Sequence, residues 1–112
     1  MYKVYGIPNC NTVKKALNHL NDSGIEVEFV NFKKTPPTKT QIQSWKQSFG
    51  DWPVNKKGPT YRKIKEEFEA ATAADKKEIL TQTTSAIKRP IVEKNGEVVC
   101  FGYNEQEYNE LF

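Results

Sequence analysis

The stretch that decides the fold is Tyr2–Leu20, with the sequence YKVYGIPNCNTVKKALNHL. Its first residues predict a short strand that ends at Gly6 and Pro8, and a helix follows. The helix is indicated by apolar residues three or four positions apart: Val13, Ala16, Leu17 and Leu20. Cys10 lies between the two elements, so we expect it at the N-terminus of the helix.

Cys10 is a candidate reactive thiol because of this position. The first N–H groups of a helix have no intrahelical partner and carry about half a positive charge, which favours a thiolate over a thiol. The pKa of a cysteine placed this way can fall well below about 8.5, and Lys14, one turn further on, would add to the effect. Asn11 or Thr12 is expected to cap the helix. The alternative is a small buried residue, since free cysteines are usually buried and inert.

Length and composition predict one globular domain, residues 1–112. A hydrophobic content of 37% is ordinary for such a protein, and no apolar run approaches the roughly 20 residues that span a bilayer. Met1 leads directly into a strand without an export signal, and the two cysteines are far apart, so we expect a cytoplasmic protein. The net charge of +3 comes with no complete nucleic-acid-binding motif, and the Cys and His spacing supports no metal site.

Elements that follow the first helix are predicted from periodicity and turn residues. Ile25–Phe32 alternates apolar and polar residues and completes a strand–helix–strand unit with parallel strands. After Pro36 and Pro37, three helices are expected to form an insertion. Their markers are a Thr38–Gln41 capping box before Ile42, Trp45 and Phe49; the apolar residues Tyr61, Ile64 and Phe68; and Thr72 with Asp75 before Ile79 and Leu80.

A hairpin is predicted near the end of the chain. Ile91–Glu93 and Val98–Phe101 flank Asn95–Gly96, the residue pair favoured in a type I′ turn. This turn predicts three cross-strand pairs: Lys94 with Glu97, Val92 with Val99, and Ile91 with Cys100. It also brings Arg89–Pro90 and the segment 100–102 to the same end of the hairpin. A short terminal helix with Tyr108 and Leu111 is expected to be capped by Asn104 and Glu107.

The predicted fold class is α/β, a thioredoxin-like mixed four-stranded sheet with an inserted helical subdomain. Residues 1–33 and 86–112 would form the core and 34–85 the insertion. The sequence resembles the ArsC-like family, which includes arsenate reductases and Spx regulators, and is most similar to its YffB-type branch. The blocks that carry the resemblance lie in the family's order: YGIPNCNTVKKA at 5–16, NKKGPTYRK at 55–63, IKRPI at 87–91 and FGY at 101–103.

The resemblance implies that Cys10 takes the place of the family's nucleophilic cysteine and Arg89 that of the arginine before the proline. Arsenate reductases hold the oxyanion with three arginines, and the other two positions fall at Asn55 and at Phe101 or Gly102. These residues cannot form the bidentate hydrogen bonds of arginine, which argues against arsenate as the substrate. The second cysteine of the Spx C-x-x-C switch is replaced by Val13.

What the resemblance implies instead is a glutathione-dependent thiol reductase. The Cys10 thiolate would attack a disulfide or another oxidised sulfur species, and glutathione, as co-substrate, would release the resulting mixed disulfide. Pro90 would be cis and present backbone to a bound thiol peptide. Arg89 would clamp a glutathione carboxylate or a thiolate, the alternative being a surface salt bridge.

Four further residues are assigned to substrate binding by the same resemblance. Lys57 or Lys14 would assist Arg89. Asn9 and Asn11 would offer hydrogen bonds to the substrate, or serve only as turn and cap residues.

Cys100 has two interpretations. The predicted hairpin places it at the end of the sheet that holds Pro90, from which it would act as a resolving thiol if its side chain faced Cys10. It would otherwise be an ordinary buried strand cysteine.

Two classes of function therefore remain open from the sequence. The first is the monothiol reductase, with arsenate reduction as a further possibility within the enzyme class. The second is an Spx-like regulator that docks on a protein such as RNA polymerase and performs no turnover. Nothing in the sequence indicates an obligate dimer, so we expect a monomer.

Overall fold

The computed structural model describes all 112 residues, which divide into two compact units. The sheet unit consists of Met1–Phe32 and Arg89–Phe112, and the helical unit of Lys33–Lys88. The sequence placed the first boundary one residue later and the second three residues earlier. That the two units act as one domain stays a prediction.

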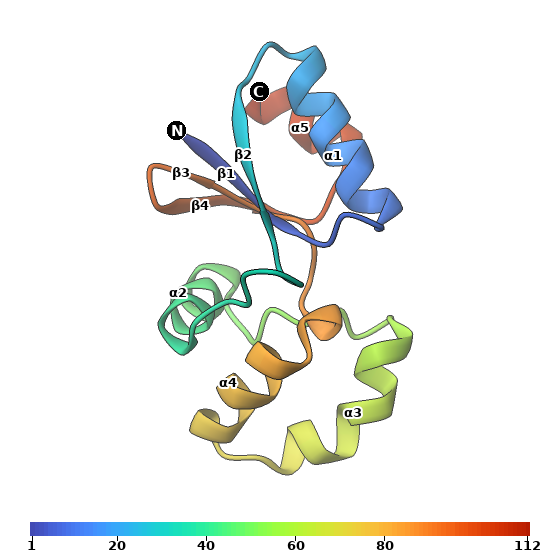
Figure 1. Cartoon of the computed structure of the whole chain (residues 1–112), viewed down its shortest axis with the longest axis vertical. Coiled ribbons are helices and arrows are strands. Elements are labelled where there is room, and N and C mark those ends of the chain that lie inside the picture. Colours follow the sequence, from blue (N-terminus) through green and yellow to red (C-terminus); the bar gives the residue numbers. More distant parts are fainter. The chain divides into compact units, whose positions relative to one another are not determined.

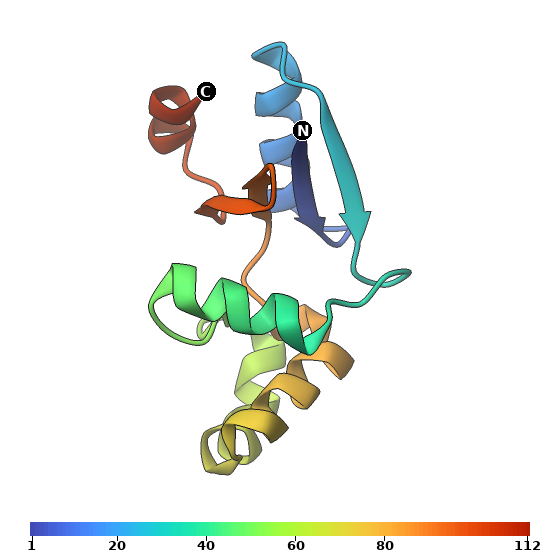
Figure 2. The same ribbon diagram turned by 90° about the vertical axis from the view of Figure 1, so that its left-hand side faces the viewer.

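The sheet unit contains four strands and two helices. In chain order these are β1 (Tyr2–Gly6), α1 (Asn11–Asp22), β2 (Val27–Asn31), β3 (Ile91–Lys94), β4 (Glu97–Phe101) and α5 (Glu105–Leu111). The strand order is β2-β1-β3-β4, in which β1 runs parallel to β2 and antiparallel to β3 (Figure 1, Figure 2). The predicted α/β class with a mixed four-stranded sheet is confirmed.

Helices α1 and α5 cover the same face of this sheet (Figure 1). One row of side chains from neighbouring strands, Val4, Val92 and Cys100, packs under both helices. The helices contribute Ala16, Leu20 and Tyr108 to the same cluster. Five of these six side chains are inaccessible to solvent, and burying one large apolar side chain stabilises a fold by about 1.5–3 kcal/mol.

Gly6 allows α1 to begin close to the end of β1. A Cβ atom at this position would lie only 2.8 Å from Cγ2 of Val13, in the first turn of α1. Val13 is itself fully buried and cannot move aside without opening the core. The glycine that ends the strand therefore fixes where the helix starts, and with it the position of Cys10.

The hairpin of β3 and β4 confirms the predicted turn but corrects the register. Asn95 and Gly96 have φ values of 52° and 85°, as a type I′ turn requires, and Lys94 pairs with Glu97. The predicted pairs of Val92 with Val99 and of Ile91 with Cys100 are wrong. A register shift between Val92 and Glu93 leaves an extra residue in β4, so that Val92 pairs with Cys100 and Ile91 with Phe101.

The helical unit consists of α2 (Lys39–Phe49), α3 (Pro59–Ala70), α4 (Ala73–Gln82) and the short 3₁₀ helix η1 (Thr84–Ala86). The predicted caps are present: Thr38 and Gln41 form a capping box, and the Thr72 hydroxyl accepts from the N–H of Asp75. Most of the expected apolar positions are buried, but Phe49 is 39% exposed. No helix of the chain combines the length and the apolar character needed to cross a bilayer.

Candidate active site at Cys10

Cys10 is the N-cap residue of α1, in an extended conformation with φ −118° and ψ 121°. The prediction that Asn11 or Thr12 caps the helix is wrong, because the carbonyl oxygen of Cys10 already accepts the first helical hydrogen bond, from Lys14 N–H at 3.0 Å. Sulfur is a weaker acceptor than oxygen, and the thiol forms no regular capping hydrogen bond. The thiol nevertheless occupies the position at which an anion is most stabilised by the helix.

Four interactions set the state of the Cys10 thiol. Partial burial raises its pKa, whereas the backbone N–H of Val13, the hydrogen bond and charge of Arg89, and the N–H of Thr12 lower it. The lowering contributions outweigh burial, so the pKa of Cys10 lies below the usual value for a cysteine. Since the thiolate is the nucleophilic form, this environment favours attack by Cys10 on an electrophile.

Arg89 reaches this site from the other end of the sequence, immediately before β3. It is joined to Pro90 by a cis peptide bond, as the resemblance implied. The carbonyl oxygen of Pro90 accepts from the N–H of Gly102 at 2.7 Å, so the start of β3 and the end of β4 lie together as expected. A guanidinium group carries a permanent positive charge and several donors, and it can stabilise a thiolate or bind an anionic ligand.

The second cysteine lies in a different environment. Cys100 is 5% exposed within the core cluster, where burial raises its pKa to about 11 despite a hydrogen bond with Tyr108. Cys100 packs in the same cluster as Ala16 and Leu20 of α1. These residues lie six and ten positions beyond Cys10, or about 9 and 15 Å from it along the helix axis, so Cys100 lies beside a later part of α1 than Cys10 does. A disulfide requires Cα atoms within about 7 Å. This packing favours the buried-strand interpretation of Cys100, and a resolving role stays a prediction.

Similarity to known proteins covers nearly the whole chain. The sequence profile of the ArsC family matches residues 5–111. The chain belongs to the ArsC family. An uncharacterised protein of Haemophilus influenzae is 35% identical over 117 residues, which covers 100% of this chain and 99% of the relative.

Two solved structures extend the family comparison. The YffB (PA3664) protein superposes with a TM-score of 0.82 at 27% identity, covering 99% of this chain and 98% of the other. A possible arsenate reductase from Streptococcus mutans superposes with a TM-score of 0.77 at 28% identity, covering 92% and 91%. The resemblance to the ArsC family and its YffB-type branch is therefore confirmed, as is the thioredoxin-like fold.

Other residues assigned from the family resemblance lie around Cys10 or in the helical unit. Asn9, Asn11 and Lys14 flank Cys10 along the chain and are exposed. Lys14 is not among the groups that lower the pKa of Cys10. Lys57 is exposed and belongs to the helical unit. It lies in a turn that is closed by a hydrogen bond from the N–H of Gly58 to the carbonyl oxygen of Asn55. The substrate-binding roles of these four residues stay predictions.

Sequence reasoning missed contributions that come from backbone or from distant side chains. The backbone N–H groups of Val13 and Thr12 lower the pKa of Cys10. The side chains of these two residues give no indication of this role in the sequence. Tyr108 was expected only as an apolar residue of the terminal helix. Its hydroxyl donates to the carbonyl oxygen of Gly102 at 2.8 Å and also interacts with Cys100.

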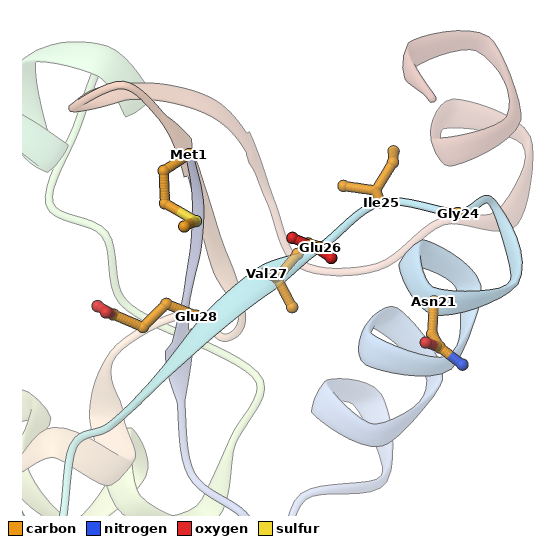
Figure 3. A pocket seen from close by; sticks show the side chains of 7 residues that line it. All are labelled: Met1, Asn21, Gly24, Ile25, Glu26, Val27 and Glu28. Atoms are coloured by element: carbon orange, nitrogen blue, oxygen red, sulfur yellow. The ribbon is translucent and has the colours of Figure 1, made fainter.

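A cavity of about 520 Å³ lies at the other end of α1 (Figure 3). Its lining includes Asn21 and the segment Gly24–Glu28, which leads into β2. Asn21 is eleven residues beyond Cys10, or about 16 Å along the helix axis, so this cavity is separate from the Cys10 site. No group of three or more His, Cys, Asp or Glu side chains is arranged to hold a metal ion.

Proposed function

We propose that this ArsC-family protein is a glutathione-dependent thiol–disulfide oxidoreductase of the cytoplasm, with Cys10 as its nucleophile. The observation that carries the proposal is the placement of one thiol both at the N-cap of α1 and beside Arg89. Each contact favours the thiolate, the form that attacks sulfur. A structural relative named as a possible arsenate reductase supports thiol-based redox chemistry in the same fold.

The reaction proceeds by two thiol–disulfide exchanges. The Cys10 thiolate attacks one sulfur of a substrate disulfide, a bond forms between Sγ of Cys10 and that sulfur, and the second sulfur leaves as a thiolate. A glutathione thiolate then attacks the substrate sulfur of this mixed disulfide and releases the Cys10 thiolate. When the substrate is a glutathione mixed disulfide and Cys10 attacks its glutathione sulfur, the substrate leaves as a free thiolate and the second exchange yields oxidised glutathione. One glutathione thiol is consumed in each cycle, and the other half of the oxidised glutathione comes from the substrate.

Arg89 has two tasks in this reaction. Before attack it stabilises the Cys10 thiolate, and during both exchanges its positive charge stabilises the thiolate that leaves. Pro90 would present backbone to the bound thiol, with Arg89 and Lys14 or Lys57 binding glutathione carboxylates. Asn9 and Asn11, on either side of the nucleophile, would donate hydrogen bonds to the substrate backbone.

The intact mass of the reduced protein after exposure to oxidised glutathione tests this proposal. We expect a single glutathione adduct in the wild type and in Cys100→Ser, and none in Cys10→Ser. An internal disulfide that is lost in both variants would instead make Cys100 a resolving thiol. Failure of the wild type to form either product at neutral pH would refute the enzymatic function and favour a non-enzymatic, Spx-like binding role.

Arsenate reduction is the second candidate, because a solved relative from Streptococcus mutans is named as a possible arsenate reductase. Only Arg89 stands at one of the three family arginine positions, so arsenate would be held weakly. We expect glutathione-dependent arsenate reduction to be far slower than reduction of a glutathione mixed disulfide. Comparable rates with the two substrates would overturn this ranking.

A further inference from the structure

Strand β2 forms an outer edge of the sheet (Figure 2). The N–H of Phe32 donates to the carbonyl oxygen of Gly6 at 2.8 Å, so the backbone of Phe32 points toward β1. Backbone groups alternate in direction along a strand, which turns Val30 and Glu28 toward β1 as well. The N–H and C=O groups of Val27 and Phe29 consequently point outward, where no other strand pairs with β2.

The two faces of this edge have different chemistry. Ile25, Val27 and Phe29 are half-buried and pack against the core cluster under α1, which leaves apolar surface along the edge. Glu26 and Glu28 lie between them on the opposite face and are exposed. The only ion pair formed by either carboxylate joins Glu28 to Lys3 at 3.8 Å, with both side chains about half exposed. Such a pair is weak and leaves this edge acidic in a protein of net charge +3.

The cavity at the end of α1 lies along this same edge (Figure 3). Five consecutive residues, Gly24–Glu28, line it together with Met1 and Asn21. Because a continuous stretch of main chain forms its wall, the cavity gives an extended segment access to the outward backbone groups of β2.

A second copy of this chain is a poor occupant of the edge. Pairing β2 with β2 of another copy would bring the carboxylates of Glu26 and Glu28 from both chains onto adjoining strands. Like charges that face each other across neighbouring strands are destabilising. The carboxylates thus protect the edge from self-association while leaving its backbone accessible.

We propose that the outer edge of β2 binds an extended segment of a partner protein in which basic and apolar side chains alternate. The segment adds a strand through the backbone groups of Val27 and Phe29. Its lysine or arginine side chains lie beside Glu26 and Glu28, and its apolar side chains cover the exposed parts of Val27 and Phe29. This docking surface is independent of Cys10.

Amide NMR spectra of the full chain, titrated with the blocked peptide Lys-Val-Lys-Val-Lys up to millimolar concentration, test the proposal. We expect saturable shifts centred on the amides of Val27 and Phe29, with slower hydrogen exchange of these two amides in the complex. The charge-inverted peptide Glu-Val-Glu-Val-Glu is expected to leave both amides unchanged.

Two variants separate the charge contribution from that of the backbone. Joint replacement Glu26→Lys and Glu28→Lys should weaken binding at least about tenfold. Glu28→Lys alone should weaken it measurably, whereas Glu97→Lys, the same single charge change at an exposed position of the other edge strand β4, should leave it unchanged. Val27→Pro removes an outward N–H at the first residue of an edge strand, where proline is tolerated, and should also abolish binding.

Four results would overturn the proposal. These are no shift at millimolar basic peptide, equal binding of the acidic peptide, shifts that map away from β2, and undiminished binding by Val27→Pro in a chain whose spectrum shows it to be folded. Concentration-dependent shifts of Val27 and Phe29 without any peptide would identify a second copy as the occupant and would also contradict it.

Discussion

The two cysteines of this chain occupy opposite kinds of environment. Cys10 ends a loop at the N-cap of α1, where two backbone N–H groups and Arg89 surround a partly accessible sulfur and lower its pKa. Cys100 lies inside β4 under two helices, where burial raises its pKa to about 11. The residue type is the same, so the difference comes from position: an N-terminal helix end solvates an anion with dipoles, and a core does not.

The largest expected effect is the difference in turnover between the variants that remove one cysteine or the other. Cys10→Ser is expected to lower the glutathione-dependent reduction of a mixed disulfide by about a hundredfold or more, since a hydroxyl is a poor nucleophile toward sulfur. Cys100→Ser should keep turnover within about twofold of the wild type per folded molecule. A loss in Cys100→Ser that matches that of Cys10→Ser, measured by turnover in a folded sample, would remove the contrast between the two cysteines.

The alkaline stability of the fold should report Cys100 together with Tyr108 and Tyr61, because burial raises the pKa of all three groups. The pKa of Cys100 rises from 9.0 to about 11 on folding, so its contribution is fully present below pH 9 and is lost as the pH rises through 11. Denaturant titrations across this range should show a fall in the unfolding free energy that is about 2–3 kcal/mol larger in the wild type than in Cys100→Val, in which only the tyrosine contribution remains. The same fall should persist in Cys10→Ser. A Cys100→Val profile identical to that of the wild type would show that Cys100 does not titrate in this way.

Arg89 should account for part of the low pKa that distinguishes Cys10 from Cys100. Arg89→Gln removes both its hydrogen bond to the thiolate and its charge, so the pKa of Cys10 should rise and reaction with iodoacetamide at neutral pH should slow by about tenfold. Arg89→Lys restores the charge without the planar donor group and should recover part of the rate. Unchanged alkylation in Arg89→Gln would assign the reactivity of Cys10 to the helix alone.

Lys14 should matter least. It is exposed and does not contribute to lowering the pKa of Cys10, so Lys14→Gln should change the alkylation rate by less than about twofold. Its effect on the KM for glutathione, measured in the same variant, tests its separate assignment to substrate binding. A tenfold slower alkylation would mean that the lysine charge acts on the thiol directly.

Much of the fold follows from local signals in the sequence. Gly6 and Pro8 mark the end of β1, the apolar spacing after Cys10 marks α1, and Asn95–Gly96 fixes the hairpin turn. These features depend on a few neighbouring residues, so they can be predicted without the rest of the chain.

The errors arise where distant parts of the chain decide the outcome. The bulge near Val99 shifts Cys100 by one position in the hairpin, and this turns its side chain into the core beside Val92. Backbone N–H groups from Val13 and Thr12, which no sequence motif records, contribute to the Cys10 site. The tertiary contact of Tyr108 with Gly102 and Cys100 joins α5 to β4 and is equally invisible to local patterns.

The most direct test of the account is the pH profile of alkylation at each cysteine, resolved by peptide mass spectrometry in one native sample. We expect Cys10 to react with a midpoint below the usual range of cysteine pKa values, and Cys100 to remain protected until the pH approaches 11. Equal midpoints for the two cysteines, or earlier labelling of Cys100 in the folded chain, would contradict the assignment of Cys10 as the reactive thiol.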